Sequence, residues 1–473
     1  MASKTAKVRE VDMTTGKLLP KILGFATVLI LTSILQLLFN SADMIVVGQF
    51  VNNDAVGAVG ATGSLNSLII NTAIGFSVGT GVVIASAYGA KNKQYGDEVL
   101  HTAILFSVIA GVVVGAVGFF FSGDFLRLMG TPDAQLKYAT EYLEIIFLGT
   151  PFNLLYNFGA SMLRAVGDTK RPLIYLTIAG VINVIINIIS VAVFDMGVVG
   201  VAIATIFSQA VSAVLVLITL ARSTGFLKFS LKRLKMHKRA FADIVRLGLP
   251  TGIQSALFNI TNVLLQSSVN SFGRDVVNGC SISGQIEGYI YAVINSISST
   301  SLTVVGQNYG ARDYARIKKT IIISTVFVTV ASLAIGWLAI LCHNPLCKIF
   351  MNGDATPEET ERIISFAYQK LIIIGGTYFL DGIMEVLTFS LRGVGYSITS
   401  MMIVLVGTCA VRILWLYGIF PFYRELTFLF LMYPISWILT LVAGGIALAV
   451  LLRRDVKRDA ALKSIASDNA VRG

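Results

Sequence analysis

The sequence has few charged residues, few cysteines and few histidines. Asp, Glu, Lys and Arg make up 13% of the 473 residues, whereas a typical soluble domain has roughly 25%. The four cysteines and three histidines follow no spacing that is typical of a zinc site. Cys342 and Cys347 are close enough in sequence to form a disulfide, although two free thiols are the simpler interpretation. The composition therefore excludes an ordinary soluble domain and predicts no metal site.

Catalytic motifs are also missing. The sequence contains no Gly-rich phosphate loop of the Walker type and no serine-centred nucleophile motif. The glycine-rich run GFSVGTG at residues 75–81 lies within an apolar segment and indicates close helix packing instead. We therefore predict that the chain is not an enzyme, encodes no ATP-driven motor, and has neither catalytic residues nor a bound cofactor.

Long apolar runs are abundant in the sequence. Hydrophobic residues make up 55% of the chain, and the mean hydropathy is +0.77. Residues 101–121 and 320–342 each lack Asp, Glu, Lys and Arg, and each run can cross a bilayer as a helix of about 20 residues. Strands of a membrane barrel would be about 10 residues long and would alternate apolar with polar residues. These runs therefore predict an all-α integral membrane protein.

Hydropathy predicts about twelve transmembrane helices. We expect them near residues 20–48, 56–86, 98–122, 138–162, 171–194, 197–221, 241–270, 277–306, 317–342, 363–390, 396–419 and 426–452. Lys and Arg concentrate in alternate loops, most densely in 222–240, whereas the loop at 351–362 is mostly acidic. The positive-inside rule therefore predicts a multi-pass protein of the plasma (inner) membrane with both termini in the cytoplasm. These loops also explain the net charge of +11 without a nucleic-acid partner.

Short sequence tags recur in the two halves of the chain. The pairs are YGAK at 88–91 with YGAR at 309–312, LRAVG at 163–167 with LRGVG at 391–395, and LLP at 18–20 with GLP at 248–250. Because the tags keep their places relative to the spans, they predict two pseudo-symmetric six-helix bundles of the same orientation. Such repeats suit alternating access by rocking of the bundles, although an old duplication without a transport role is the alternative.

The spans and repeats together predict five segments. These are a cytoplasmic arm at 1–19, an N-lobe of six transmembrane helices at 20–221, a basic cytoplasmic linker at 222–240, a C-lobe of six transmembrane helices at 241–452 and a cytoplasmic tail at 453–473. Nothing in this organisation requires an oligomer, so we expect a monomer in the lipid bilayer.

Ionisable side chains inside the apolar spans are the strongest indication of function. Each costs roughly 2.5–3.5 kcal/mol at the bilayer centre on insertion scales. The candidates are Asp43, Glu287, Asp381, Glu385 and Arg412. Asp381 and Glu385 share one helical face and can share a proton. Arg412 can instead neutralise one of them as a structural ion pair, and together with Glu287 and Glu385 it forms a possible cavity charge network.

Asp43 has no acidic neighbour in the sequence. Its expected companions are Asn183 and Asn187, which are four residues apart in the predicted fifth span. A carboxylate surrounded by amide and backbone oxygens can hold Na⁺ or a proton, because hard cations prefer oxygen ligands. Hydrogen bonding between packed helices is the alternative role for the two asparagines.

Eight motifs follow one another in a specific order across both halves. They are VDMTTG at 11–16, SADMIVVGQF at 41–50, ASAYGAKN at 85–92, MLRAVGDTKRP at 162–172, GVVGVAIATIFSQ at 197–209, GLPTGIQS at 248–255, QNYGAR at 307–312 and LDGIMEVLTFSLRGVG at 380–395. In these motifs the chain closely resembles the multidrug and toxic compound extrusion (MATE) family, its bacterial members in particular. The resemblance covers residues from about 20 to 452.

The resemblance implies a V-shaped fold of two six-helix lobes. It also implies export of cationic, amphipathic compounds in exchange for Na⁺ or H⁺. In the family, Asp43 and Asn183 fall on positions of the cation site in the N-lobe, and Asp381 falls on the tenth-helix aspartate linked to the cation site in the C-lobe.

Two positions depart from the family pattern. The family often has Asn-x-x-x-Asp where this sequence has Asn183 and Asn187, which removes one negative charge. Some sodium-coupled members have a glutamate in the seventh helix, at a place that is apolar here, near Phe258. Because few charges surround Asp43, the sequence favours H⁺ over Na⁺ as the coupling ion.

A flippase for a lipid-linked sugar or a cell-wall precursor is the alternative function. Related families share the repeated-bundle plan, but such flippases usually need a basic cavity for phosphate groups. The spans of this chain contain acids with only Arg412 opposite them. That balance favours small-molecule cargo that is cationic or amphipathic.

Overall fold

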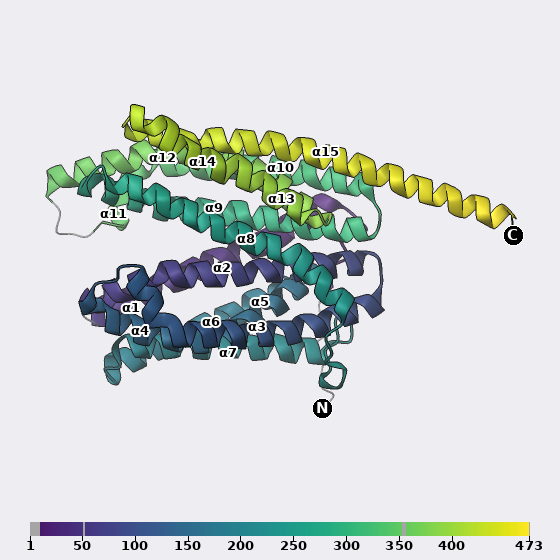
Figure 1. Cartoon of the computed structure of the whole chain (residues 1–473), viewed down its shortest axis with the longest axis horizontal. Helices are drawn as coiled ribbons and strands as arrows, with labels where there is room; N and C mark the ends of the chain where they lie inside the picture. The colour runs from purple at the N-terminus through teal and green to yellow at the C-terminus, as the bar shows by residue number, and fades with distance from the viewer. Residues whose placement is uncertain (1–9, 51–52, 352–355, 473) are drawn as a thin grey trace. The chain divides into compact units, whose positions relative to one another are not determined.

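The computed structural model describes residues 10–50, 53–351 and 356–472 (Figure 1). These residues are almost entirely helical and include no β-strand, so the predicted all-α class is confirmed for the described part of the chain. Contacts between residues divide the chain into two compact units, residues 1–259 and 260–473. We describe them separately as unit 1 and unit 2.

The first eight helices begin in unit 1. They are α1 (Leu18–Phe50), α2 (Asn53–Gly89), α3 (Lys93–Leu128), α4 (Asp133–Leu148), α5 (Thr150–Ala165), α6 (Lys170–Ile188), α7 (Gly197–Arg222) and α8 (Lys238–Asn270). A π-helical turn, Ile189–Val193, continues α6, and a 3-10 turn, Leu231–Arg233, lies between α7 and α8.

The remaining helices belong to unit 2. They are α9 (Arg274–Gly310), α10 (Tyr314–Leu341), α11 (His343–Ile349), α12 (Pro357–Gly393), α13 (Ser397–Val404), α14 (Val411–Leu414) and α15 (Leu426–Arg472). Two π-helical turns, Leu405–Ala410 and Trp415–Ile419, lie on either side of α14, and a 3-10 turn, Phe420–Phe422, follows. The four cysteines are free thiols.

Eight stretches of the described residues are long and apolar enough to cross a membrane, judged by length and composition.

The predicted fourth span, 138–162, is wrong as one continuous helix, because α4 ends at Leu148 and α5 begins at Thr150. Pro151 lies in the first turn of α5 and has no backbone N–H to continue the hydrogen-bond ladder across Gly149.

The repeated tags adopt the same backbone conformation in both units. Lys91 and Arg312, which end the YGA tags, have φ angles of 54° and 57°. Residues other than glycine rarely occupy this left-handed backbone region. The residues that follow them, Asn92 and Asp313, cap α3 and α10. Each side chain accepts a hydrogen bond from the backbone N–H three residues later, at 3.1 and 2.9 Å. The sequence repeat is therefore also a repeat of local structure.

Helices α2 and α8 cross closely in unit 1. Gly75 and Gly79 of α2 face Gly252 and Gly248 of α8. A Cβ atom on Gly75 would lie 2.5 Å from the backbone nitrogen of Gly252, and one on Gly79 would lie 2.4 Å from that of Gly248. The interpretation of residues 75–81 as a helix-packing segment is confirmed.

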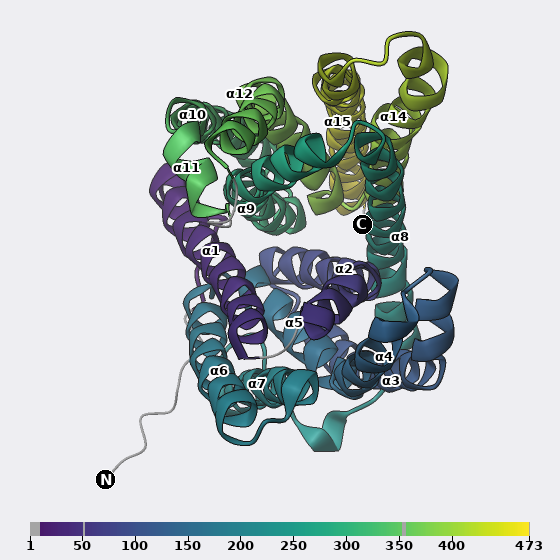
Figure 2. The same ribbon diagram turned by 90° about the vertical axis from the view of Figure 1, so that its left-hand side faces the viewer.

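In unit 2, α12 packs against α9, α10 and α15. Figure 2 shows α9, α10 and α12 side by side. Small residues allow the close approach: a Cβ atom on Gly336 of α10 would lie 2.4 Å from the carbonyl oxygen of Gly375 on α12. This packing buries the middle of α12, where the acidic candidates lie.

The N-terminal segment, residues 10–17, lies against unit 1. The Val11 N–H donates to the Val166 carbonyl at 3.0 Å, and Met13 is almost fully buried. Gly167 has a φ angle of +93°, and a Cβ atom there would lie 2.5 Å from the Val11 carbonyl oxygen. Gly395 occupies the matching position in unit 2 with a φ of +87°, but a Cβ atom there would meet nothing within 4 Å.

Candidate functional site

The first candidate site lies in unit 1 between α1 and α6. Asn187 Nδ2 donates to Asp43 Oδ1 at 2.5 Å and to Asn183 Oδ1 at 3.2 Å. Both asparagines are buried and Asp43 is partly buried. The structure thus brings together the three residues that the sequence grouped.

The atoms of this site suit a small cation. Asn187 Oδ1 is buried and has no hydrogen-bond partner among the described residues, which costs roughly 1–3 kcal/mol if nothing binds there. Tyr142 of α4 lies close enough to Asp43 to interact with it electrostatically. One carboxylate and two amide groups can accept a proton or coordinate Na⁺ through oxygen.

The second candidate site lies in unit 2 around α12. Asp381 and Glu385 are one turn apart and are 5% and 8% exposed. The Tyr291 hydroxyl of α9 donates to Glu385 Oε1 at 3.0 Å. Asp381 Oδ2 and Glu385 Oε2 are buried and have no hydrogen-bond partner among the described residues. Two buried carboxylates one turn apart repel each other, and a shared proton relieves that repulsion.

Arg412 of α14 is the predicted basic residue of this region. It is 2% exposed and attracts Asp381 electrostatically. Its Nε donates to Ser436 Oγ at 3.2 Å, and its guanidinium carbon lies 4.2 Å from the centre of the Tyr433 ring. α15 therefore fixes the position of Arg412.

A second buried arginine, Arg392, was missed by the sequence analysis. It is 4% exposed, attracts Glu385 electrostatically and donates from Nε to Ser400 Oγ at 3.3 Å. The LRG tag was placed in the loop after the tenth span, but α12 continues through Gly393 and carries Arg392 into the protein.

Glu287 of α9 has a basic partner that the sequence analysis also missed. Lys370 Nζ of α12 lies 3.2 Å from Glu287 Oε2, and the two side chains are 13% and 10% exposed. Ser283 Oγ donates to Glu287 Oε1 at 2.7 Å. The prediction that only Arg412 opposes the acids in the spans was therefore wrong. Lys370 lies in the predicted tenth span itself, which was the signal that could have found it.

π-helical turns accompany both sites. In unit 1 the turn Ile189–Val193 begins two residues after Asn187. In unit 2 the turns Leu405–Ala410 and Trp415–Ile419 lie on either side of Arg412. The turns lie in the fifth and eleventh predicted spans, which occupy corresponding places in the two halves of the repeat. π-helical turns occur frequently at functional sites because they shift side chains out of the regular helical register.

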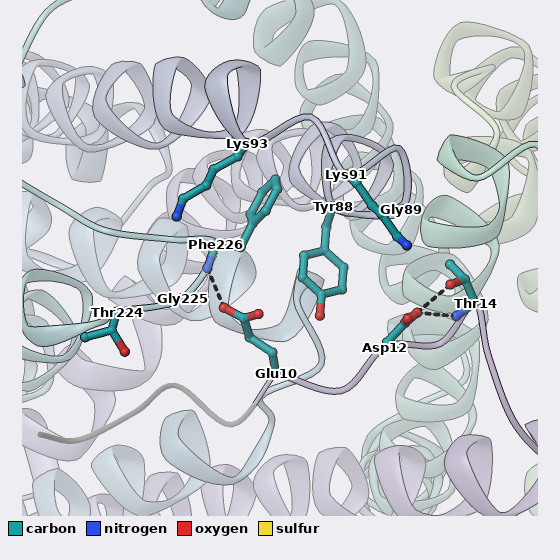
Figure 3. Close-up of a pocket in the computed structure, with 10 residues that line it drawn as sticks. All are labelled: Glu10, Asp12, Thr14, Tyr88, Gly89, Lys91, Lys93, Thr224, Gly225 and Phe226. Atoms are coloured by element: carbon teal, nitrogen blue, oxygen red, sulfur yellow. Dashed lines mark hydrogen bonds between the residues drawn. The ribbon is translucent and has the colours of Figure 1, made fainter. Parts of the chain in front are cut away.

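A polar pocket of about 380 Å³ lies elsewhere in unit 1, where the N-terminal segment meets the ends of α2 and α7. Figure 3 shows Glu10 and Asp12 on one side of the pocket and Lys91 and Lys93 on the other. Glu10 Oε1 accepts a hydrogen bond from the Phe226 N–H at 2.5 Å. These contacts hold the N-terminal segment against the rest of unit 1. We therefore interpret the pocket as part of the packing of that segment.

No group of three or more His, Cys, Asp or Glu side chains among the described residues has the arrangement of a metal site. Both candidate sites are built from carboxylates with hydroxyl, amide or guanidinium neighbours. Carboxylates with such neighbours can accept a proton or coordinate an alkali cation.

A family model described as MatE matches residues 29–189 and 250–417. The chain is 28% identical over 381 residues to the probable multidrug resistance protein YoeA of Bacillus subtilis (strain 168), covering 78% of this chain and 80% of the relative. It is 24% identical over 341 residues to an FAD transporter of Shewanella oneidensis, covering 70% of this chain and 72% of the relative.

Solved structures show the same fold. A crystal structure of a MATE protein in complex with MaL6 matches with a TM-score of 0.87 at 21% identity, covering 96% of this chain and 100% of that one. The fold is thus the two-lobed, twelve-helix fold of MATE transporters, as the sequence predicted.

Proposed function

Because the chain belongs to the MATE family of membrane transporters, we propose that it is a secondary active antiporter that exports cationic, amphipathic compounds in exchange for H⁺ or Na⁺. It is a multi-pass protein of the plasma membrane and is not an enzyme. The proposal concerns its coupling ion, its cargo and its mechanism.

One contrast carries the proposal: the acids of the two candidate sites differ from Glu287 in how they are neutralised. Glu287 has Lys370 at 3.2 Å. Asp43 has the neutral Asn187 as its hydrogen-bond donor, and Asp381 and Glu385 each keep an oxygen without a hydrogen-bond partner among the described residues. A carboxylate inside a membrane span that no protein cation pairs directly is a candidate carrier of a mobile cation.

The two sites differ in the range of cations that they suit. Asp381 and Glu385 lie close together, and Arg412 and Arg392 already supply positive charge nearby, so a proton is the favoured ion there. The unit 1 site offers Asp43 and amide oxygens, which accommodate either H⁺ or Na⁺. A bound cation shifts the transporter between its states only if the two states bind it with different affinity. Cation binding at Asp43, Asp381 or both would thus load the state that releases the cargo.

The proposed organisation follows the sequence repeat. An N-lobe at 20–221 and a C-lobe at 241–452 would be joined by the basic linker 222–240. The arm at 1–19, the linker and the tail at 453–473 would face the cytoplasm, which is the side that the positive-inside rule assigns to basic loops. The protein would act as a monomer on small-molecule substrates.

The decisive experiment measures efflux of ethidium from proteoliposomes that contain the purified protein. A pH gradient and a Na⁺ gradient are imposed separately. The variants Asp43→Asn and Asp381→Asn are compared with the control Asp275→Asn, which removes a carboxylate paired with Arg362 at the surface of unit 2. We expect transport under one of the two gradients, retained in the control and reduced to the level of protein-free liposomes in at least one of the other variants.

Three outcomes would contradict parts of the proposal. Transport that survives in both Asp43→Asn and Asp381→Asn would exclude these carboxylates as ion carriers. Transport of flavin nucleotides instead of ethidium would replace the cationic cargo, as the similarity to an FAD transporter suggests. For the alternative function of a flippase, the buried Arg392 and Arg412 and the partly buried Lys370 would supply positive charge for a phosphate group. No transport under either gradient, together with flipping of a fluorescent lipid-linked sugar, would thus establish the flippase.

A further inference from the structure

A groove of about 510 Å³ runs along the surface of unit 2 between α10 and α15. The groove is lined by Leu387 of α12 and by the buried Leu448 and Leu452 of α15. Ile322 of α10, which is 63% exposed, forms one wall. Most of the groove is therefore apolar, and its volume lies within the range of small-molecule sites, roughly 300–1,000 Å³.

Basic side chains gather at one end of this groove. Lys318 lies near the start of α10, and Arg453 and Lys457 lie one turn apart on α15. All three side chains are exposed, and none forms an ion pair with another described residue. None of the described residues that line the groove is acidic.

The nearest acids in the sequence are engaged elsewhere. Asp455 accepts hydrogen bonds from the hydroxyls of Tyr309 and Tyr396 at 3.0 and 2.9 Å. Asp459 accepts a hydrogen bond from the Tyr314 hydroxyl at 2.7 Å, and its Oδ2 lies 3.7 Å from Arg312 Nε. The positive charge at the groove therefore stays available to a ligand.

We propose that this groove binds one anionic phospholipid. Its acyl chain would lie along the apolar walls, and its phosphate would lie among Lys318, Arg453 and Lys457. Basic pockets at the ends of membrane helices recognise acidic head groups in this way, because the phosphate gains charge pairing while the chain stays in an apolar environment. If both termini are cytoplasmic, the lipid comes from the inner leaflet.

Charge also argues for a lipid over a second copy of the chain. A two-fold symmetric contact through the groove would bring two identical basic clusters together, and like charges at close range repel. A soluble anion would use the three cations and leave the apolar walls without a role.

The test is native mass spectrometry of the full chain with phosphatidylglycerol or phosphatidylcholine. The variant Lys318→Gln/Arg453→Gln/Lys457→Gln is compared with Lys319→Gln/Arg454→Gln/Arg458→Gln. The control removes three exposed basic residues, each next to one in the groove, that do not line it. We expect the preference for phosphatidylglycerol to fall about fivefold per charge in the groove variant and to change by less than about twofold in the control.

A second variant tests the apolar part. Ala449 is exposed and lines the groove, so Ala449→Trp fills the groove without disturbing a buried contact. We expect it to lower phosphatidylglycerol binding with all three basic residues in place. Millimolar inorganic phosphate should not compete with the lipid.

Each other result overturns the proposal in a recognisable way. Equal losses in the groove and control variants would reduce the effect to diffuse surface charge. Displacement of lipid by inorganic phosphate would make the site one for a free anion. A dimer that Ala449→Trp dissociates would make the groove an interface between copies.

Discussion

The carboxylate sites of unit 1 and unit 2 differ in charge although the local backbone of the two units repeats. Unit 1 surrounds one carboxylate, Asp43, with two asparagine amides. Unit 2 buries Asp381 and Glu385 close to two arginines. A duplicated fold thus keeps its helix ends while its buried charges change independently. Under the proposed function, the net charge around each site, and not the shared architecture, would decide which ion that site holds.

The largest effect on stability is expected from breaking the direct ion pair of unit 2, between Lys370 and Glu287. Lys370→Met would leave Glu287 buried and unpaired, and we expect a loss of about 3–5 kcal/mol in the free energy of unfolding. Thermal unfolding in detergent would measure it. Asp43→Asn is the contrasting variant in unit 1, and because its partner is neutral we expect a change of less than about 1 kcal/mol.

The double variant Glu287→Gln/Lys370→Met controls for the size of the new side chain. We expect it to recover most of the stability, because no charge is left unpaired. An equally large loss in the double variant would assign the effect of Lys370→Met to packing.

Gly167 of unit 1 and Gly395 of unit 2, which occupy matching positions in the repeat, give the next largest difference in stability. Gly167→Ala would place a Cβ atom 2.5 Å from the Val11 carbonyl oxygen, whereas Gly395→Ala would meet only open space. Both positions have a positive φ, which alone costs roughly 1–2 kcal/mol for a residue with a Cβ. We expect Gly167→Ala to be the more destabilising by about 1–2 kcal/mol in thermal unfolding. Equal losses would mean that the contact with Val11 relaxes freely.

A smaller effect is expected from adding a charge to unit 1. Asn187→Asp would place a second carboxylate beside Asp43, and we expect it to lower the Na⁺ concentration for half-maximal transport by about tenfold, or roughly 1.4 kcal/mol. Efflux measured against Na⁺ concentration would show the shift. Asn183→Asp is the matched variant, because it adds the same charge one turn away on α6. An unchanged Na⁺ response in both variants would separate this site from ion coupling.

The smallest effect concerns the N-terminal segment, residues 10–17, which belongs to unit 1. Burial raises the pKa of Asp12, but the hydrogen bonds from Thr14 and the charges of Lys21 and Lys91 outweigh it and hold the pKa below its ordinary value of 3.8. A group whose pKa is lowered by folding stabilises the fold above its unfolded pKa, and that contribution is lost as pH falls through its folded pKa.

Hydrogen exchange of residues 10–17 should therefore stay protected at neutral pH and weaken only below about pH 4. Asp12→Asn should show weaker protection than the natural chain at neutral pH and no such pH dependence. Loss of protection near pH 6 in the natural chain would contradict this account.

Hydropathy was sufficient to predict the helical class, because a membrane span needs only length and apolar composition. The association of Asp43 with Asn183 and Asn187 also followed from spacing and resemblance, because residues four apart share a helix face. The break at Gly149 and the π-helical turns did not, because neither changes the hydropathy of a span. Arg392 was missed because its tag was assigned to the loop after the tenth span, and Lys370 was overlooked although it lies inside that span. Only tertiary packing shows that Lys370 lies beside Glu287 and that Arg392 lies near Glu385.

The N-terminal segment also bears on the order of synthesis. Glu10 is synthesised 216 residues before Phe226, whose backbone N–H donates a hydrogen bond to its side chain. Such a distant contact forms late, because its partner must first leave the ribosome and the helices between must be in place. Residues 10–17 are therefore made well before their partner and are among the last parts of unit 1 to reach their final position, so their docking would mark the completion of unit 1.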